Sequence, residues 1–593
     1  MKKIFITIIA ACSILSLSAQ DAMNRELTLE KEYNPGIRDA NKINQLPELS
    51  APEAPKTQVK YSDYTRPYSV SPYLIHYTPS AYFTDLAASN KIGYLNLGVS
   101  TSPNIDADLG VQILNTNRDY LSIYASNRYS NSKQAFLQNE DVDSKMKLHD
   151  IWGGLKYKHY FDAAIFNIGG QYNYSKYNYY GRPSDFLDYY TDDIDQTANF
   201  FRIYTGVQAV EGSDLFYKLN VAYTNFKYKH TNELMWEDGR RENRMIIDGV
   251  LQKQFNSTWK IGIDVSFKNY SYSDPEEKIY RYETPEGTIE PTPIVYSPWD
   301  NYDDYFLLSG TPYFQAEGTN WNVRIGLNPE YRFRNNSKFT LSPDIHLSYA
   351  PMEQFSLYIN AAGGVKDNSL FSSFYENRYM SPEWRLRDSR SPLDGTLGIK
   401  ITPVPGLMFD LFGGYKITKD EYFCYAPWGT KYYPLITDSD VTYIAVIPAT
   451  IYSLYSDAKI LKLGANIQYK YKDNFSIGLK GTYYKWDIDE DSGVDEPWGK
   501  PKFVMDGRIN YNVGVIPLSV ALNYHLEAGR PNYFNTDEDM DNINDLSLNA
   551  NYAFNDSFSV YASLNNLLFQ KYDIWYGYPA QNFNLMGGIS LKF

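Results

Sequence analysis

Aspartates at alternate positions form one candidate site for chemistry in this sequence. They are Asp487, Asp489, Asp491 and Asp495. Alternating carboxylates of this kind converge on hard cations such as Ca2+ in calcium-binding loops. Here Gly493 stands one position later than in those loops, and Trp498 occupies the twelfth position, where a bidentate Glu is usual. The four aspartates are therefore a divalent-cation candidate, and a solvated acidic loop is the alternative interpretation. No other cofactor is expected.

The remaining residues that could do chemistry lack the required spacing. Cys12 and Cys424 are the only cysteines, so neither a CxxC pair nor a zinc motif can form. No Ser/His or His/Asp pair stands at a spacing that suggests a nucleophile beside its base. An enzyme is consequently the least favoured of three functional hypotheses. The net charge of −14, without any Lys/Arg stripe, also argues against a nucleic-acid partner.

The N-terminal 91 residues differ from the rest of the chain. Residues 1–19 place two lysines before an apolar run and end Ser-Ala, which predicts a signal peptide and export. Residues 20–60 are polar and punctuated by proline, typical of an extended periplasmic segment. Residues 61–91 combine Tyr with Pro, a composition that suits a chain lying against a surface, and they could partly plug the lumen of the barrel predicted below. Beyond residue 19, no apolar run is long enough for a membrane-spanning helix.

Residues 92–593 show the period-two alternation of strands with two different faces. In the segment 259–267, the odd positions are all apolar or aromatic, whereas the even positions are Lys, Gly, Asp and Ser. Clusters of turn-forming residues recur along the chain, and much longer acidic and aromatic connections alternate with them. Short turns on one side and long loops on the other are typical of outer-membrane barrels.

The predicted fold is therefore all-β: a transmembrane antiparallel barrel of about 22 strands (20–24), with short periplasmic turns and long extracellular loops. The segment 441–455 could hide one additional pair of strands. Closure also removes the unpaired sheet edges that lipid cannot satisfy. Six charged residues on polar strand faces are expected to point into the lumen and to set selectivity in an open pore. They are Lys260, Asp264, Asp344, His346, Lys480 and Lys592.

The C-terminal residues resemble the closing hairpin of TonB-dependent receptor barrels. The likeness lies in Leu564–Tyr572, in the Tyr-Gly-Tyr-Pro sequence at 576–579, and in the final strand 583–593. It implies that Phe593 belongs to the signal recognised by the barrel-insertion machinery. The family places a globular plug of well over a hundred residues before the first strand. We find no such motif in residues 20–91, so partial plugging by residues 61–88, inward-folded loops or a partner protein are the alternatives for closing the lumen.

Two functional hypotheses of different kinds follow. The resemblance implies ligand uptake or solute transport across the outer membrane of a diderm bacterium. The alternative is an accessory or structural barrel that anchors a periplasmic or cell-surface partner protein through residues 20–60 and its loops. In either case the expected surroundings are outer-membrane lipid and lipopolysaccharide.

Overall fold

The computed structural model describes residues 91–593, except for residues 138–142, 182–194, 211, 231–238, 257, 274–277, 281–293, 297–302, 335–337, 383–385, 427–430, 438–439, 447–449, 473, 490–492 and 534–537. The predicted signal peptide, the segment 20–60 and the Tyr/Pro-rich segment up to residue 90 lie outside the described residues. None of the described helices has the length and apolar character that crossing a membrane would require.

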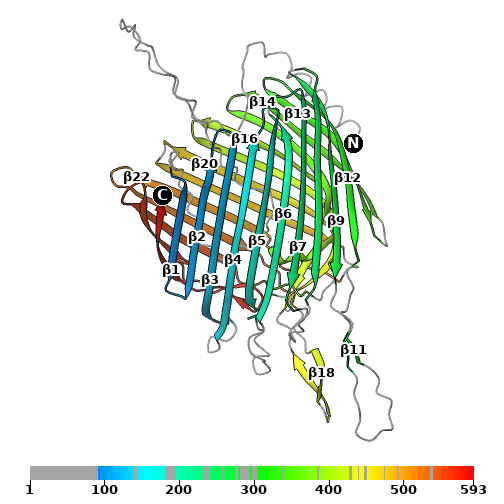
Figure 1. Cartoon of the computed structure of the whole chain (residues 1–593), viewed down its shortest axis with the longest axis vertical. Coiled ribbons are helices and arrows are strands. Elements are labelled where there is room, and N and C mark those ends of the chain that lie inside the picture. Colours follow the sequence, from blue (N-terminus) through cyan, green and yellow to red (C-terminus); the bar gives the residue numbers. More distant parts are fainter. Residues whose placement is uncertain are drawn as a thin grey trace.

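Twenty-two antiparallel strands form the barrel wall, as the alternating pattern predicted. The first and last strands pair with each other, so the sheet is closed. Figure 1 shows the strands of the wall lying side by side and inclined to its long axis. The strands are β1 (Gly93–Ser100), β2 (Asn104–Asn115), β3 (Asp119–Ala135), β4 (Asp143–Tyr160), β5 (Ala164–Asn178), β6 (Asp195–Ala209), β7 (Leu215–Tyr228), β8 (Arg241–Gln254), β9 (Trp259–Ser273), β12 (Tyr305–Glu317), β13 (Trp321–Phe333), β14 (Lys338–Met352), β15 (Phe355–Lys366), β16 (Ser389–Val404), β17 (Leu407–Tyr425), β20 (Tyr452–Tyr471), β21 (Phe475–Ile488), β22 (Phe503–Val513), β23 (Leu518–Ala528), β24 (Ile543–Ala553), β25 (Phe558–Asn565) and β28 (Asn584–Lys592).

The remaining elements belong to the connections. β18 (Lys431–Thr437) and β19 (Asp440–Val446) form a hairpin of their own, which extends beyond the wall (Figure 1). The described residues of the segment 441–455 therefore add no further pair of strands to the barrel, because this hairpin is separate from the barrel sheet. Three-residue strands β10 (Lys278–Tyr280) and β11 (Ile294–Tyr296) pair with each other, as do β26 (Asp573–Trp575) and β27 (Tyr578–Pro579). Helix α2 (Leu370–Glu376) lies between β15 and β16.

The two faces of the wall follow from side-chain alternation. In β9, Ile261, Ile263 and Val265 are 47%, 38% and 41% exposed, whereas Gly262 between them is buried. The exposed apolar side chains of such strands form the surface that faces lipid, because the opposite face carries the polar residues. Asp264 lies on that inner face.

Connections at the two ends of the barrel differ in length. At one end, β14 and β15 are joined by residues 353–354, and β16 and β17 by residues 405–406. At the other end, residues 367–388, 426–451 and 489–502 join neighbouring strands. Outer-membrane barrels place short turns in the periplasm and long loops outside, and we name the two ends of this barrel accordingly, the first the periplasmic and the second the extracellular end. Both Gly93 and the chain end at Phe593 lie at the periplasmic end.

The seam between β1 and β28 depends on the terminal residue. The Phe593 carbonyl accepts hydrogen bonds from the Ile92 and Gly93 amides at 2.7 and 3.0 Å, and the Phe593 amide donates to the Gly93 carbonyl at 3.0 Å. The ring of Phe593 occupies the space where a side chain at Gly93 would lie. The last residue therefore takes part in barrel closure. Its expected role as an insertion signal stays a prediction.

Deleting Phe593 is expected to lower the yield of folded barrel. The deletion removes three backbone hydrogen bonds, each with a net contribution of about 1 kcal/mol. The fraction of chain that migrates as compact barrel in unheated SDS gels measures the effect. Phe593→Tyr, which keeps the backbone bonds and the ring, is the control and should retain the yield. Equal yields of compact barrel for the deletion and the wild type would contradict the prediction.

Candidate functional site

An ion-pair cluster lies on the lumen wall formed by β9, β13 and β14. The Arg324 guanidinium contacts the carboxylates of Asp264 and Asp344, each at 2.7 Å. His346 lies 3.2 Å from the second oxygen of Asp344. Tyr313 of β12 presents its ring to Arg324, with 3.5 Å between the guanidinium carbon and the ring centroid. The structure thus brings together three residues that the sequence analysis placed in the lumen.

Arg324 was missed in the sequence analysis, although the alternation contains the signal for it. Ile325 and Leu327 are exposed on the lipid side, so Arg324 between Val323 and Ile325 must lie on the inner face. Antiparallel register places it directly opposite His346. A buried or half-buried arginine between two carboxylates satisfies charges that would otherwise repel each other.

The other three predicted lumen residues lie apart from this cluster. Lys260 of β9 pairs with Glu317 at 3.0 Å, close to the short-turn end. Lys480 stands on β21, in register with Asn466 and Asp506 on its neighbouring strands. Lys592 lies beside the seam, opposite Tyr94. The polar faces of the strands hold all six residues, but only three of the six meet.

Arg324→Leu is expected to make an opened pore more selective for cations. The substitution leaves Asp264 and Asp344 without their shared counter-charge, and rings of carboxylates favour cations in channels. The reversal potential of a loop-shortened variant in a KCl gradient measures the change. Arg324→Lys, which keeps the positive charge, is the control. An unchanged reversal potential in the Leu variant would contradict a role for this cluster in selectivity.

The aspartates of the predicted cation loop are partly described. Asp487 pairs with Lys459 at 3.7 Å, and the Asp489 amide donates to the Asp457 carbonyl at 3.0 Å. Asp495 is described too, whereas Asp491 lies outside the described residues. No group of three or more metal-ligating side chains occurs in the part of the chain that the structure describes. Calcium binding at this loop stays a prediction, and calorimetric titration of the wild type and of an Asp489→Asn variant tests it.

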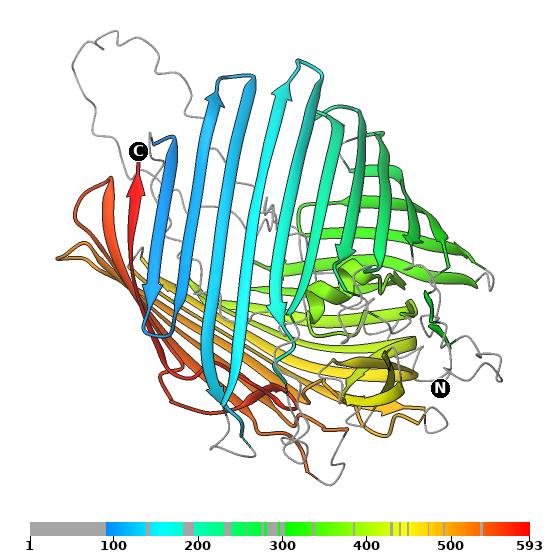
Figure 2. The same cartoon turned by 60° about the horizontal axis from the view of Figure 1, so that its bottom comes forward.

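The connection 367–388 folds into the extracellular end of the lumen, and we call its described residues the cap. Figure 2 shows α2 of this connection inside the ring of strands. The side chains of Phe371 and Phe374 are buried. Phe371 packs edge-on against Phe200 of β6, with ring centroids 5.1 Å apart, and Phe374 lies 5.4 Å from Phe226 of β7. Inward folding of a loop, one of the three alternatives for closing the lumen, is thus observed.

The sequence of the cap explains why a helix begins here. Ser369 is the N-cap residue, and its hydroxyl accepts a hydrogen bond from the Ser372 amide. The Ser372 hydroxyl in turn accepts from the Ser369 amide, which completes a capping box. The helix is only seven residues long, so its stability must come from the apolar side chains that it buries.

Ion pairs fasten the cap to one side of the wall. Arg378 makes two contacts with the Asp150 carboxylate of β4, at 3.1 and 3.3 Å. Arg332 of β13 contacts Asp388 at 2.9 Å. Burial raises the pKa of the Asp388 carboxyl, and the hydrogen bond and charge of Arg332 offset part of this rise. These contacts replace the hydration that the buried charges lose.

Asp367, at the start of the cap, has a second set of partners. Its carboxylate contacts Lys268 at 3.4 Å and Arg244 at 3.7 Å, and the Tyr270 hydroxyl donates to it. Burial by itself would raise the pKa of Asp367, but the two cations and the hydroxyl together hold it below its usual range. The cap therefore begins with an ionised carboxylate bound to β8 and β9.

Two further connections meet the cap from the other side of the barrel. Tyr379 stacks on Tyr578 of the connection 566–583, with ring centroids 4.3 Å apart. Met380 forms a bridge with Ile451, which precedes β20, and its sulfur lies 4.0 Å from the sulfur of Cys424. The cap thus spans the lumen from β4 to β17. The arrangement places an aromatic-lined cap above the charged residues of the lumen wall.

No family model and no curated protein matches the sequence. Among solved structures, the barrel is similar to the siderophore receptor PirA from Acinetobacter baumannii, with a TM-score of 0.62, 10% identity, and coverage of 86% of this chain and 81% of that one. A mutant of the ferric enterobactin receptor PfeA from Pseudomonas aeruginosa, in complex with enterobactin, has a TM-score of 0.61 and 10% identity, with coverage of 86% of this chain and 82% of that one. The FrpB iron transporter from Neisseria meningitidis has a TM-score of 0.61 and 9% identity, with coverage of 85% of this chain and 82% of that one.

These identities are low, so the likeness concerns the fold. The closed 22-strand wall and the similarity to such receptors agree with the predicted location in the outer membrane. The resemblance to TonB-dependent receptor barrels that the C-terminal hairpin suggested is thereby confirmed at the level of the fold.

Proposed function

We propose that the chain is a receptor-type barrel that takes up a ligand across the outer membrane. The observation that carries the proposal is the cap: an inward-folded, ion-paired connection that closes the extracellular end of a wide, charged lumen. A barrel of this size encloses a lumen large enough for a ligand and needs such closure to remain impermeable at rest. The proposal involves no catalytic step, so the proposed activity is not that of an enzyme.

The ligand class that we propose is iron or an iron chelate. The support comes from the structural neighbours, whose titles describe a siderophore receptor, a ferric enterobactin receptor and an iron transporter. A periplasmic partner protein that binds the N-terminal segment fits the same proposal. The alternative, an accessory barrel that only anchors a partner, is less well supported, because the neighbours are receptors and transporters.

Uptake by whole cells tests the proposal. A strain lacking the gene, the same strain complemented with the wild type, and one complemented with a cap-deleted variant are grown under iron limitation. Accumulation of radioactive iron is then measured, supplied as free ferric ion and as several ferric siderophores. Loss of accumulation for one of these forms in the deletion strain, restored by the wild type, is the expected result. Equal accumulation of every form in all strains would overturn the iron proposal.

A further inference from the structure

Basic residues gather on the outward face of the wall at its extracellular end, across β3 to β8. We call them the basic belt. They are Lys133, Lys145, Lys147, Lys176, Lys227, Lys229 and Arg241. Among the described residues of the same face and level, the acidic ones are Asp143 and Asp195, and Asp195 lies 2.8 Å from Lys176 and 3.8 Å from Lys147. The belt is thus strongly positive, although the whole chain carries a net charge of −14.

The alternation of each strand places the belt outside the lumen. In β5, Lys176 shares a face with Ile168 and Tyr172, which are 39% and 47% exposed, whereas Tyr177 on the opposite face is buried against the cap. In β7, Lys227 likewise shares a face with the exposed Tyr223. Lys176 lies four residues beyond Tyr172 toward the long connections, a rise of about 13 Å. The belt therefore lies above the apolar band, at the level of lipid headgroups.

Several members of the belt face like charges. Lys133 stands directly opposite Lys145, and Lys227 directly opposite Arg241. Like charges in directly opposed positions of an antiparallel pair destabilise the sheet. None of these four side chains has an ion-pair partner among the residues that the structure describes. An anion bound between the strands would relieve this repulsion.

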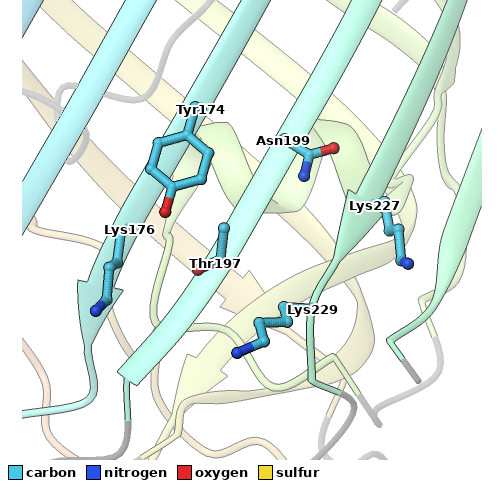
Figure 3. Close-up of a pocket in the computed structure, with 6 residues that line it drawn as sticks. All are labelled: Tyr174, Lys176, Thr197, Asn199, Lys227 and Lys229. Atoms are coloured by element: carbon cyan, nitrogen blue, oxygen red, sulfur yellow. The ribbon is translucent and has the colours of Figure 1, made fainter. Parts of the chain in front are cut away.

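The centre of the belt is hollowed. A cavity of about 360 Å³ lies between β5, β6 and β7. Figure 3 shows the six side chains that line it, with Lys176, Lys227 and Lys229 beside the hydroxyl and amide groups of neighbouring residues. They are Tyr174, Lys176, Thr197, Asn199, Lys227 and Lys229. Ammonium, hydroxyl and amide groups together can surround a phosphate with donors.

The opposite side of the same rim is organised differently. There Lys419 pairs with Asp457, and Lys459 pairs with Asp487 at 3.7 Å. These lysines also lie on the outward face, in line with the exposed Tyr415 and Leu461. Lys419 and Lys459 on that side are therefore neutralised by aspartates of the protein itself, in contrast to the opposed lysines and arginine of the belt.

We propose that the basic belt binds the phosphate-bearing headgroup of a lipid in the outer leaflet, with phosphate in the cavity between β5 and β7 and the acyl chains along the apolar band below. Each basic residue at a lipid surface adds about 1 kcal/mol of attraction to anionic headgroups. The outward orientation and the level of the belt make a membrane lipid the occupant, because a soluble ligand would enter through the lumen. This inference does not depend on the proposed iron uptake.

Native mass spectrometry of the detergent-solubilised full-length mature protein tests the proposal. The protein is titrated with lipid A, a glycolipid that carries two phosphates, and with the same lipid lacking one phosphate. The test variant is Lys145→Gln/Lys227→Gln/Lys229→Gln. The matched control is Lys419→Gln/Lys459→Gln/Lys485→Gln, which removes the same charge from the same face and level on the other side. Replacing the three belt lysines by Arg keeps the charge.

The belt variant is expected to bind the two-phosphate lipid about a hundredfold more weakly, and the control to bind it as the wild type does. The Arg variant should retain binding. Removing one phosphate should weaken binding to the wild type, the control and the Arg variant, and should have little further effect on the belt variant. Equal losses in belt and control variants, or no loss in either, would overturn the proposal. Complete displacement of the lipid by millimolar inorganic phosphate would assign the site to a free anion instead. Migration of each variant as compact barrel in unheated SDS gels verifies its fold.

Discussion

Replacing residues 367–388 by a short glycine-serine linker is expected to open the barrel to ions. The cap spans the lumen and packs against β4–β8 on one side and against Cys424 and Tyr578 on the other. Without it, a 22-strand wall encloses a wide aqueous passage. In planar bilayers, the chain with the cap should show no channel openings, whereas the chain without it should show large, stable steps of single-channel conductance. This is the largest effect that the structure predicts.

The design of that experiment separates the cap from the N-terminal segment. Four proteins are compared: the mature chain with and without residues 20–91, each with and without the cap. Conductance that appears only when both are absent means that each seals the lumen independently. A matched control replaces the hairpin at 431–446, whose strands β18 and β19 pair with each other outside the barrel sheet, and should stay closed. Closed channels in both cap-deleted proteins would contradict the prediction and identify other connections as the seal.

Arg378→Ala is expected to release the cap without unfolding the barrel. The substitution leaves Asp150 buried without its counter-charge, since both side chains are only 13% exposed. Breaking a buried ion pair by removing one partner costs about 3–5 kcal/mol. The barrel retains its ladder of backbone hydrogen bonds, so the cost falls on the local equilibrium between the closed and the open cap. The open population should increase by about a hundredfold or more.

The rate at which the Cys424 thiol is labelled reports the opening of the cap. This thiol is buried beneath Met380, and Cys424 is the only cysteine among the described residues. Labelling with a maleimide, located by peptide mass, should be slow in the wild type and at least tenfold faster in Arg378→Ala, because the reagent reaches the open state only. Lys459→Ala, which removes an exposed pair on the outer face, is the control and should label slowly. Equal rates in Arg378→Ala and the wild type would mean that aromatic packing alone holds the cap.

The two interaction sites have different consequences for the cell. Opening of the cap would affect passage through the lumen, and hence uptake. Loss of the basic belt would affect the contact between the wall and its lipid, and hence the integrity of the membrane around the barrel. A cap-deleted strain and a belt-variant strain should therefore differ in phenotype, since the residues concerned lie on opposite faces of β4–β8.

The sequence alone determined the architecture. A period of two places every second side chain on the same face of a strand, so the order of residues in segments such as 259–267 and 339–349 is sufficient to assign two faces and their contents. Turn-forming residues at 350–353 and 403–406 marked the short end, and an even number of strands followed. Asp264, Asp344 and His346 could be assigned to the lumen because the face of a residue depends only on its parity along the strand.

The tertiary structure decided which residues meet. Asp150 and Arg378 are 228 positions apart, and no local pattern relates them. The same holds for the cap as a whole, because the side on which a long connection folds depends on packing among distant aromatic residues and not on its own composition. The basic belt also became visible only in three dimensions, since its residues are scattered from 133 to 241. Periodicity is a local property of the chain and can be read from it, whereas closure of a barrel brings together residues that only the register between strands can relate.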